Sequence, residues 1–246
     1  MKRSNSGYAS YFDPLEWDAA SETAHPAASY FTFQRGRDLA TQWCLKSSRV
    51  GDSWLDAGCG TGQLAAELAR HGRLVWGLDH DQRMIERART LFPASPFVPA
   101  PQFIVGAVDR LPFPDCSLDG MVITSVLGCL ANPEMFYVEA SRALKKGGTL
   151  ISTVTNRQSL LLRFNYLFRK KETTRFHLYS MPEVSESLHK NQFQIETILY
   201  YNFFLSTQQR IFPSPAISGF LDRLGPSPWR RHLARNFLVL ARRNYD

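Results

Sequence analysis

The sequence lacks the features that mark several classes of protein. No stretch approaches the roughly 18 consecutive apolar residues that a membrane-spanning helix needs. The basic start, MKRSNSGYAS, is not followed by the apolar run of a secretory signal. The four cysteines lie far apart, and none forms a Cys-x-x-Cys pair, which disfavours a zinc site or a disulfide framework. We therefore expect a cytoplasmic protein in a reducing compartment, without a metal centre.

Acidic residues are also fewer than basic ones. The 246 residues include 29 Lys and Arg but 22 Asp and Glu, a formal net charge of +7. Such a balance agrees with anionic partners, such as nucleic acid or lipid headgroups, but we favour a solvated surface without such a partner. Nucleic acid is disfavoured, because no interleaved aromatic and basic motif of a recognition module is present.

From residue 53 to 154, short apolar runs alternate with helical patterns. This order predicts a parallel sheet with crossover helices. One of these helices begins at Asn132, a good N-cap before a proline, and we expect it to end at 145–148. The predicted strands are Ser53–Ala57, Leu74–Asp79, Phe103–Gly106, Gly120–Ser125 and Thr149–Val154.

A glycine-rich turn follows the first predicted strand. Glycine stands at 58, 60 and 62, directly before a helix. Glycines allow positive φ and let a ligand approach the backbone, and a helix start offers N–H groups to an anion. Asp79 ends the next strand about 20 residues later, where an acid meets ribose hydroxyls in folds of this kind. Together they predict a nucleoside-binding site.

Four stretches in this order resemble the motifs of class I S-adenosylmethionine-dependent methyltransferases, and of the subgroup that includes ubiquinone, menaquinone and small-molecule methyltransferases. The resemblance implies an α/β fold, a Rossmann-like, seven-stranded, mostly parallel sheet with helices on both faces. Its last two strands would be 193–201 and 236–241, the final one antiparallel. The stretches are LDAGCGTG (55–62), GLDHDQRMI (77–85), LPFPDCSLD (111–119) and ALKKGGTL (143–150).

The same resemblance implies one methyltransferase domain over 1–246. Residues 53–154 would form the cofactor-binding core, and 1–50 an N-terminal helical cap over the sheet edge or the active site. Residues 155–235 would hold a second cap, for the acceptor, together with the sixth strand, and 236–241 would be the last strand.

The cofactor implied by the resemblance is S-adenosylmethionine, released as S-adenosylhomocysteine. Gly58, Cys59 and Gly60 would contact its methionine part through their backbone. Asp56 would lie near its amino group, and Asp79 would hold the ribose.

On the adenine side, His80 and Met84 would flank the ring. Many relatives have Gly-Asp-Ala after the third strand, whereas this chain has Gly-Ala-Val-Asp at 106–109. The backbone N–H of Val108 would still reach the ring, and Asp109 would replace the missing acid at the adenine amino group.

Methyl transfer from a sulfonium is an in-line displacement, so a general base is needed only when the acceptor must lose a proton. His177 and His25 are the candidate bases, with Tyr30 or Tyr179 less favoured. The alternative for His177 is a structural role before a helix capped by the Ser-x-x-Glu box at 180–183.

The segment 159–171 predicts an amphipathic helix with basic residues around its apolar face. It fits a cover over the active site or, alternatively, peripheral contact with a membrane. We expect methyl transfer to a small-molecule acceptor. The alternatives are a quinone or lipid acceptor at the membrane surface, an RNA acceptor, and a module that binds the cofactor without catalysis. The acceptor and the oligomeric state stay open.

Overall fold

The computed structural model describes residues 28–94, 99–130, 132–168, 177–206, 211–212, 217, 220–221 and 229–244. The helices of the first part are α2 (Ala28–Lys46), α3 (Gln63–Arg70), α4 (Gln82–Leu91), the 3-10 turn η1 (Leu127–Cys129) and α5 (Pro133–Ala143). They are followed by α6 (Leu160–Phe168), α7 (Met181–Lys190) and the short α9 (Arg230–Leu233).

The main sheet has seven strands in the order β3-β2-β1-β4-β5-β9-β6. The first five are parallel, and β9 runs antiparallel between β5 and β6. This arrangement confirms the predicted seven-stranded, mostly parallel sheet. Its strands are β1 (Ser53–Ala57), β2 (Leu74–Asp79), β3 (Gln102–Val105), β4 (Leu118–Ile123), β5 (Leu144–Thr155), β6 (Phe193–Tyr201) and β9 (Asn236–Arg243). A small separate hairpin pairs β7 (Leu205–Ser206) with β8 (Ile211–Phe212).

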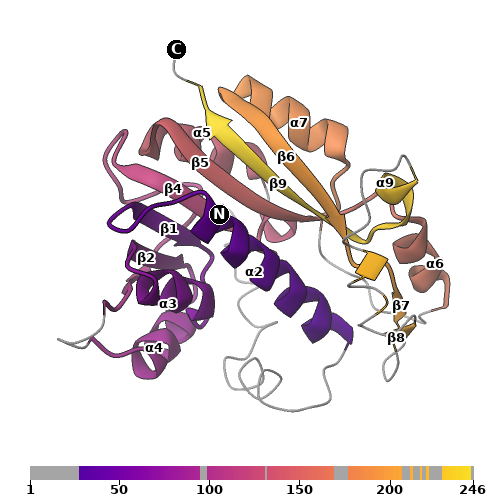
Figure 1. Ribbon diagram of the computed structural model, residues 1–246, viewed down its shortest axis with the longest axis horizontal. Helices are drawn as coiled ribbons and strands as arrows, with labels where there is room; N and C mark the ends of the chain where they lie inside the picture. The colour runs from indigo at the N-terminus through magenta and orange to yellow at the C-terminus, as the bar shows by residue number, and fades with distance from the viewer. Residues whose placement is uncertain are drawn as a thin grey trace, which may run out of the picture.

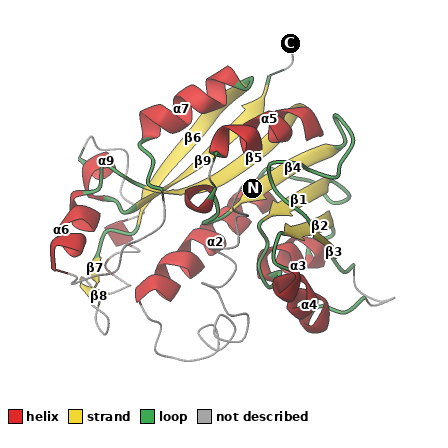
Figure 2. Cartoon of the chain, turned by 180° about the vertical axis from the view of Figure 1, so that it is seen from behind, coloured by secondary structure: helices red, strands yellow, loops and turns green. Residues whose placement is uncertain are grey.

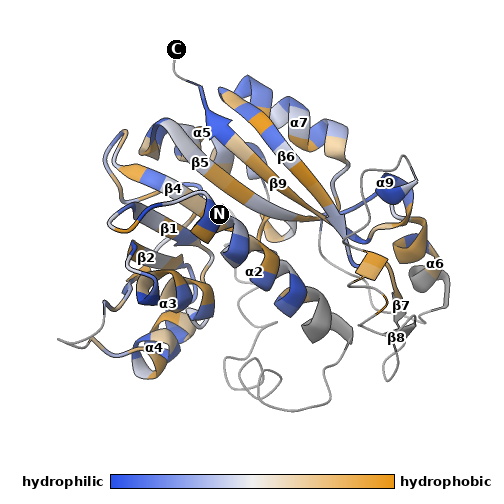
Figure 3. Ribbon diagram, viewed as in Figure 1, coloured by the Kyte–Doolittle hydropathy of each residue, from blue (hydrophilic) through white to orange (hydrophobic). Residues whose placement is uncertain are grey.

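Each face of the sheet buries its own apolar core. On one face, α2, α3 and α4 pack over buried residues that include Trp54, Phe103 and Leu238. On the other face, α5 and α7 cover Leu55 and Met121 (Figures 1 and 2). The middle of β5 and β9 is apolar on the hydropathy colouring, as a strand covered on both faces must be (Figure 3).

Polar side chains begin three of the helices. Asp81 caps α4 by accepting the Arg83 N–H, and Asn132 caps α5 by accepting the Glu134 N–H. The Ser180 N–H and hydroxyl both donate to the Glu183 carboxylate, at 2.8 and 2.7 Å, at the start of α7. The predicted caps at 132 and 180–183 are thus confirmed.

The predicted end of α5 was wrong. The helix ends at Ala143, and Leu144 already starts β5. Leu144 pairs with Leu118, and the register then shifts before Gly120 pairs with Thr149. Gly147, at φ 75°, lies inside this irregular stretch, so the Lys-Lys-Gly-Gly sequence is a bulge in a strand and not a helix terminus.

The helices α2 and α6 belong to the two predicted caps. The helix α2 crosses the face of the sheet and contacts α3, β5 and β9, so this part of the predicted N-terminal cap covers a face and not an edge. The helix α6 contacts α9 and β7 at the far end of the molecule (Figure 1). Residues 169–171 of the predicted amphipathic segment lie outside the described residues.

Within the described ranges, no helix has the length and apolar character required to cross a bilayer.

Candidate cofactor site

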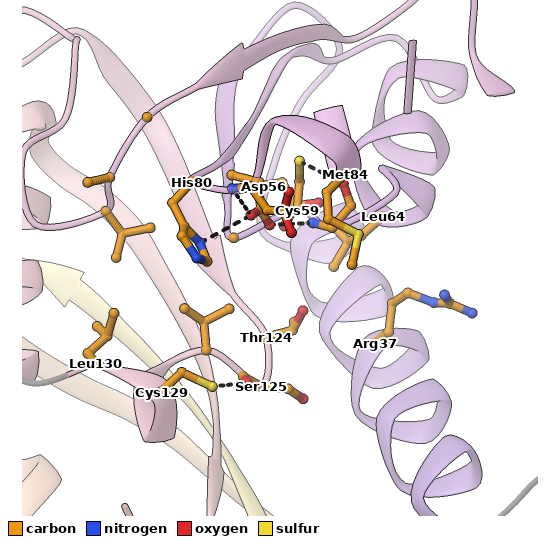
Figure 4. Close-up of a pocket in the computed structure, with 18 of the residues that line it drawn as sticks. Arg37, Asp56, Cys59, Leu64, His80, Met84, Thr124, Ser125, Cys129 and Leu130 are labelled. Atoms are coloured by element: carbon orange, nitrogen blue, oxygen red, sulfur yellow. Dashed lines mark hydrogen bonds and ion pairs between the residues drawn. The ribbon is translucent and has the colours of Figure 1, made fainter. Parts of the chain in front are cut away.

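A cavity of about 390 Å³ opens at the carboxyl edge of the parallel strands. Its walls come from the turn after β1, the ends of β2 and β3, the start of α4, the loop after β4, and α2. The strand order reverses between β1 and β4, and open α/β sheets bind ligands where this reversal occurs. Figure 4 shows the turn side of the cavity facing the loop after β4.

The glycine turn is folded tightly onto β2. The N–H groups of Gly58 and Cys59 both donate to the Leu78 carbonyl, at 2.7 and 3.0 Å. Gly58 has φ 76°, and a Cβ at this position would come within 2.3 Å of the Val126 side chain. Glycine is therefore required here for two reasons, the left-handed backbone and the close approach of the loop after β4.

Asp79 holds this turn in place. Its Oδ2 accepts the Gly60 N–H at 2.9 Å, and its Oδ1 accepts the Asp81 N–H at 3.0 Å. The side chain is 11% exposed and lines the cavity. Each carboxylate oxygen can accept a second hydrogen bond, so ribose hydroxyls can still donate to it. The sequence placed Asp79 at the site, but its bond to Gly60 was not foreseen.

Asp56 is the most unusual group in the cavity wall. It is 1% exposed, and neither carboxylate oxygen has a hydrogen-bond partner among the described residues. Burial raises its pKa to about 7. The backbone N–H of Ala65, which lies nearby without meeting hydrogen-bond geometry, lowers the pKa, and the negative charge of Asp79 raises it further. A buried carboxylate without a partner is costly, and an ammonium group in the cavity would relieve that cost. The amino group of S-adenosylmethionine fits this requirement.

The predicted adenine residues lie together on one side of the cavity. Met84 on α4 and Val108 are buried, whereas His80 and Asp109 are exposed at the rim. The Nδ1 atom of His80 lies 3.3 Å from Asp79 Oδ1, and this contact raises the pKa of the imidazole. The structure brings all four residues to the cavity, so the changed sequence at 106–109 still fits an adenine pocket.

The opposite wall is the loop between β4 and α5. Ser125 adopts φ 61°, and its N–H donates to Thr153 Oγ1 at 2.8 Å, which fixes this strained corner on β5. The Cys129 Sγ lies 3.9 Å from the Ser125 carbonyl, and burial raises the thiol pKa to about 11. Cys129 and Leu130 therefore present an uncharged surface to the cavity.

Of the candidate bases, His177 and Tyr179 do not line the described cavity, and the side chains of the other two lie outside the described residues. The backbone N–H of His177 donates to the Gly128 carbonyl at 2.8 Å, so this residue borders the wall. Its side chain is exposed and is not among the described residues that line the cavity. Tyr179 is half-buried beside the core under α5 and α7, also outside that lining. His25 and the side chain of Tyr30 lie outside the described residues.

The motif at 111–119 supports the fold and does not contribute to the cavity lining. Arg142 of α5 donates to the carbonyls of Leu111 and Phe113 and forms ion pairs with Asp115 and Glu139. The arginine therefore ties the loop between β3 and β4 onto α5.

The sequence predicted an N-terminal helical cap over the sheet edge or the active site, but it did not identify the residues of α2 that reach the cavity. Phe33, Gln34 and Arg37 line the cavity from this helix. Their spacing matches one face of a helix, but aromatic and basic residues at such spacing are common on any covering helix. The pattern alone did not mark them.

Residues 55–152 match the model of a methyltransferase domain family. A demethylmenaquinone methyltransferase of Symbiobacterium thermophilum is 33% identical over 123 residues, 48% of this chain and 49% of that protein. A probable S-adenosylmethionine-dependent methyltransferase of Mycolicibacterium smegmatis is 33% identical over 108 residues, 44% of this chain and 40% of that protein. The chain thus aligns with about half or less of the length of these curated relatives.

The fold is also that of known methyltransferases. The magnesium protoporphyrin IX methyltransferase from Synechocystis superimposes with a TM-score of 0.68 at 18% identity, over 96% of this chain and 98% of that one. The sequence match covers the strands from β1 to β5, and the structural match extends the likeness to β6 and β9. Residues 55–152 therefore match a methyltransferase domain, and the fold of the chain is like that of solved methyltransferases.

Proposed function

We propose that the protein transfers a methyl group from S-adenosylmethionine to a small-molecule acceptor. The observation that carries this proposal is the buried carboxylate of Asp56 beside the glycine turn, in the same cavity as Asp79. An unpartnered acid and a second acid that can accept ribose hydroxyls, both in one cavity, match the ammonium group and the ribose of an amino-acid nucleoside.

Different residues would bind different parts of the cofactor. Asp56 binds the ammonium group, and Asp79 binds the ribose hydroxyls. The turn residues Gly58, Cys59 and Gly60 let the methionine part pass close to the backbone. Their N–H groups are already bonded to Leu78 and Asp79, so the polar contacts they offer are carbonyl oxygens.

The adenine would lie between Met84 and the exposed ring of His80. A polarizable thioether packs well on an aromatic face. The Val108 N–H and the Asp109 carboxylate would bind the ring edge, where relatives have a different acid.

The bound cofactor would supply an electrophilic methyl group on a sulfonium. The protein contributes alignment, because holding donor and acceptor in line removes much of the entropic barrier. The acceptor would lie against Ser125, Val126, Cys129 and Leu130, opposite the turn. His177 and His25 stay the candidate bases, for an acceptor that must lose a proton.

A quinone or lipid acceptor at a membrane surface is the second candidate. Two observations favour it, the relative named for demethylmenaquinone and the surface of α6. On this helix Leu160 and Phe164 are 52% and 50% exposed, and the exposed Arg163 lies between them. Co-sedimentation with vesicles of anionic or neutral lipid tests this candidate, because a soluble acceptor requires no vesicle binding.

Turnover tests the main proposal. The protein is incubated with S-adenosylmethionine and a panel of phenols, amines, carboxylic acids and quinols, and S-adenosylhomocysteine is measured. We expect its release to depend on an acceptor and to be lost in Asp79→Ala. Cofactor binding without turnover on any compound of the panel would favour a binding module instead.

A further inference from the structure

Arg37 is a positively charged residue in the lining of the cavity. It lies on α2, outside the segment that matches the family. Among the described residues that line the cavity, it is the one arginine or lysine. Its guanidinium makes no hydrogen bond or ion pair with any described residue. Figure 4 shows its side chain leaving α2 below Leu64 and Met84, with the guanidinium directed away from Asp56 and Thr124, so contact with a ligand beside Asp56 requires rotation about its side-chain bonds.

The positive charge of Arg37 lowers the pKa of Asp56. Burial raises the pKa of Asp56, and the positive charge of Arg37 acts in the opposite direction. The two groups are not paired with each other, since both oxygens of Asp56 lack a partner among the described residues. Among the acids and bases that line the cavity, Asp56 and Arg37 thus have opposite charges, and the side chain of each lacks a hydrogen-bond partner among the described residues. A zwitterion has the complementary charges.

The glycine turn leaves little else to bind a carboxylate. In many phosphate and carboxylate sites such a turn supplies its N–H groups. Here the amides of Gly58 and Cys59 donate to Leu78, and that of Gly60 donates to Asp79. The Gly62 amide donates back to the Cys59 carbonyl at 3.0 Å. These four amides are committed to the turn itself, so an anion in the cavity needs a donor from another element.

We propose that Arg37 binds the α-carboxylate of the methionine part of S-adenosylmethionine, while Asp56 binds its ammonium group. A guanidinium binds a carboxylate through two parallel N–H bonds, which gives orientation as well as attraction. The helix α2 is then part of the cofactor site, not only a cover over the sheet. This inference rests on the proposed function, because it requires that the amino-acid nucleoside binds in this cavity.

The test compares two ligands that differ by one carboxylate. S-adenosylhomocysteine carries both polar groups, and its decarboxylated analogue, S-adenosyl-3-thiopropylamine, keeps only the amine. In calorimetric titrations, Arg37→Ala is expected to weaken S-adenosylhomocysteine by about 10- to 100-fold, the usual effect of losing a charged hydrogen-bonded pair. The analogue should bind both proteins equally within about twofold. Arg37→Lys should recover part of the lost affinity, because lysine keeps the positive charge but lacks the two parallel N–H donors of the guanidinium.

Two variants serve as controls. Lys46→Ala removes the same charge from the exposed end of α2 and should change neither affinity. Asp56→Asn should weaken both ligands, because both keep the amine. Unfolding midpoints of the ligand-free variants, measured by circular dichroism, show whether Arg37→Ala is folded.

The outcomes are distinct. Equal weakening of both ligands by Arg37→Ala, or an unchanged affinity for S-adenosylhomocysteine, overturns the role of Arg37. An unchanged cofactor affinity with a raised KM for an anionic acceptor would assign Arg37 to the acceptor instead. If the wild-type protein binds neither ligand at millimolar concentration, the proposed function itself fails.

Discussion

The helices α2 and α6 both flank the five-strand core, and both were expected to cover the active site. The structure separates them. The helix α2 buries Leu39, Ala40 and Cys44 against the sheet, and it turns its first half to the cavity. The helix α6 buries Leu162 but leaves Leu160 and Phe164 half-exposed, and its described part does not line the cavity.

The difference shows that an apolar face does not tell which surface it will cover. The sequence of α6 is strongly apolar, yet its partners are α9 and β7 at the end of the molecule. The sequence of α2 is mixed, and long-range packing on β5 and β9 decides its position. We therefore expect cofactor binding to depend most on the glycine turn, less on α2 and not at all on α6.

The largest effect is expected for Gly58→Ala. The new Cβ would need φ 76° and would meet Val126 at 2.3 Å, so the turn or the loop after β4 must move. We expect at least about 100-fold weaker binding of S-adenosylhomocysteine by calorimetry, equal to about 3 kcal/mol.

Gly51→Ala is the matched control. Gly51 has φ 90°, but nothing lies within 4 Å of its added Cβ. It should lower the free energy of unfolding by about 1 kcal/mol and leave the affinity unchanged. Similar affinities in the two variants would contradict the tight packing of the turn.

Asp79→Ala should have the next largest effect. We expect S-adenosylhomocysteine to bind about 10- to 100-fold more weakly, a loss of about 1–3 kcal/mol in binding free energy. The variant loses the ribose contact, and it also frees the Gly60 and Asp81 amides that Asp79 accepts. Adenosine separates the two losses, because it keeps the ribose and lacks the methionine part. Unchanged affinity in a folded variant would show that Asp79 only supports the turn and does not bind the cofactor.

Asp56 predicts a pH dependence of the ligand-free protein. Its pKa rises from 3.8 to about 7 on folding. Between these values the folded protein holds a proton that the unfolded chain has lost, so stability falls as the pH rises through this window. The slope is at most about 1.4 kcal/mol per pH unit. Chemical unfolding from pH 4 to 8 should show this fall in the wild type relative to Asp56→Asn, and parallel curves would refute it.

The smallest effect is expected for the double substitution Leu160→Ser and Phe164→Ser on α6. Both side chains are half-exposed and belong to no cavity wall that the structure describes. Calorimetry should give an affinity for S-adenosylhomocysteine within about twofold of the wild type. A loss as large as that of Arg37→Ala would remove the distinction between α2 and α6.

The sequence predicted the cofactor half of the site better than the acceptor half. The bounds of β1 and β2 agree with the predicted strands, because apolar runs between turn residues are local signals, and those of β6 agree with the strand that the resemblance implied. Asp56 and Asp79 were found because their places relative to the glycines are fixed along the chain. Their surroundings, one acid without a bond and one bonded to Gly60, depend on packing and were not predictable.

The remaining differences come from long-range contacts. The end of α5 was misplaced because pairing of Leu144 with Leu118 begins a strand where the sequence has a good helix terminus. Arg37 was overlooked because a single arginine on a helix is usually solvated. The roles of the cavity residues, of His177 and His25, and the single-domain division of 1–246 stay predictions.

The most direct measurement is a calorimetric titration of the ligand-free wild-type protein with S-adenosylhomocysteine. The account predicts one site per chain with a dissociation constant in the micromolar range, because the turn, Asp56 and Asp79 are assembled in one cavity. No saturation at millimolar ligand would contradict the assignment of this cavity to the cofactor.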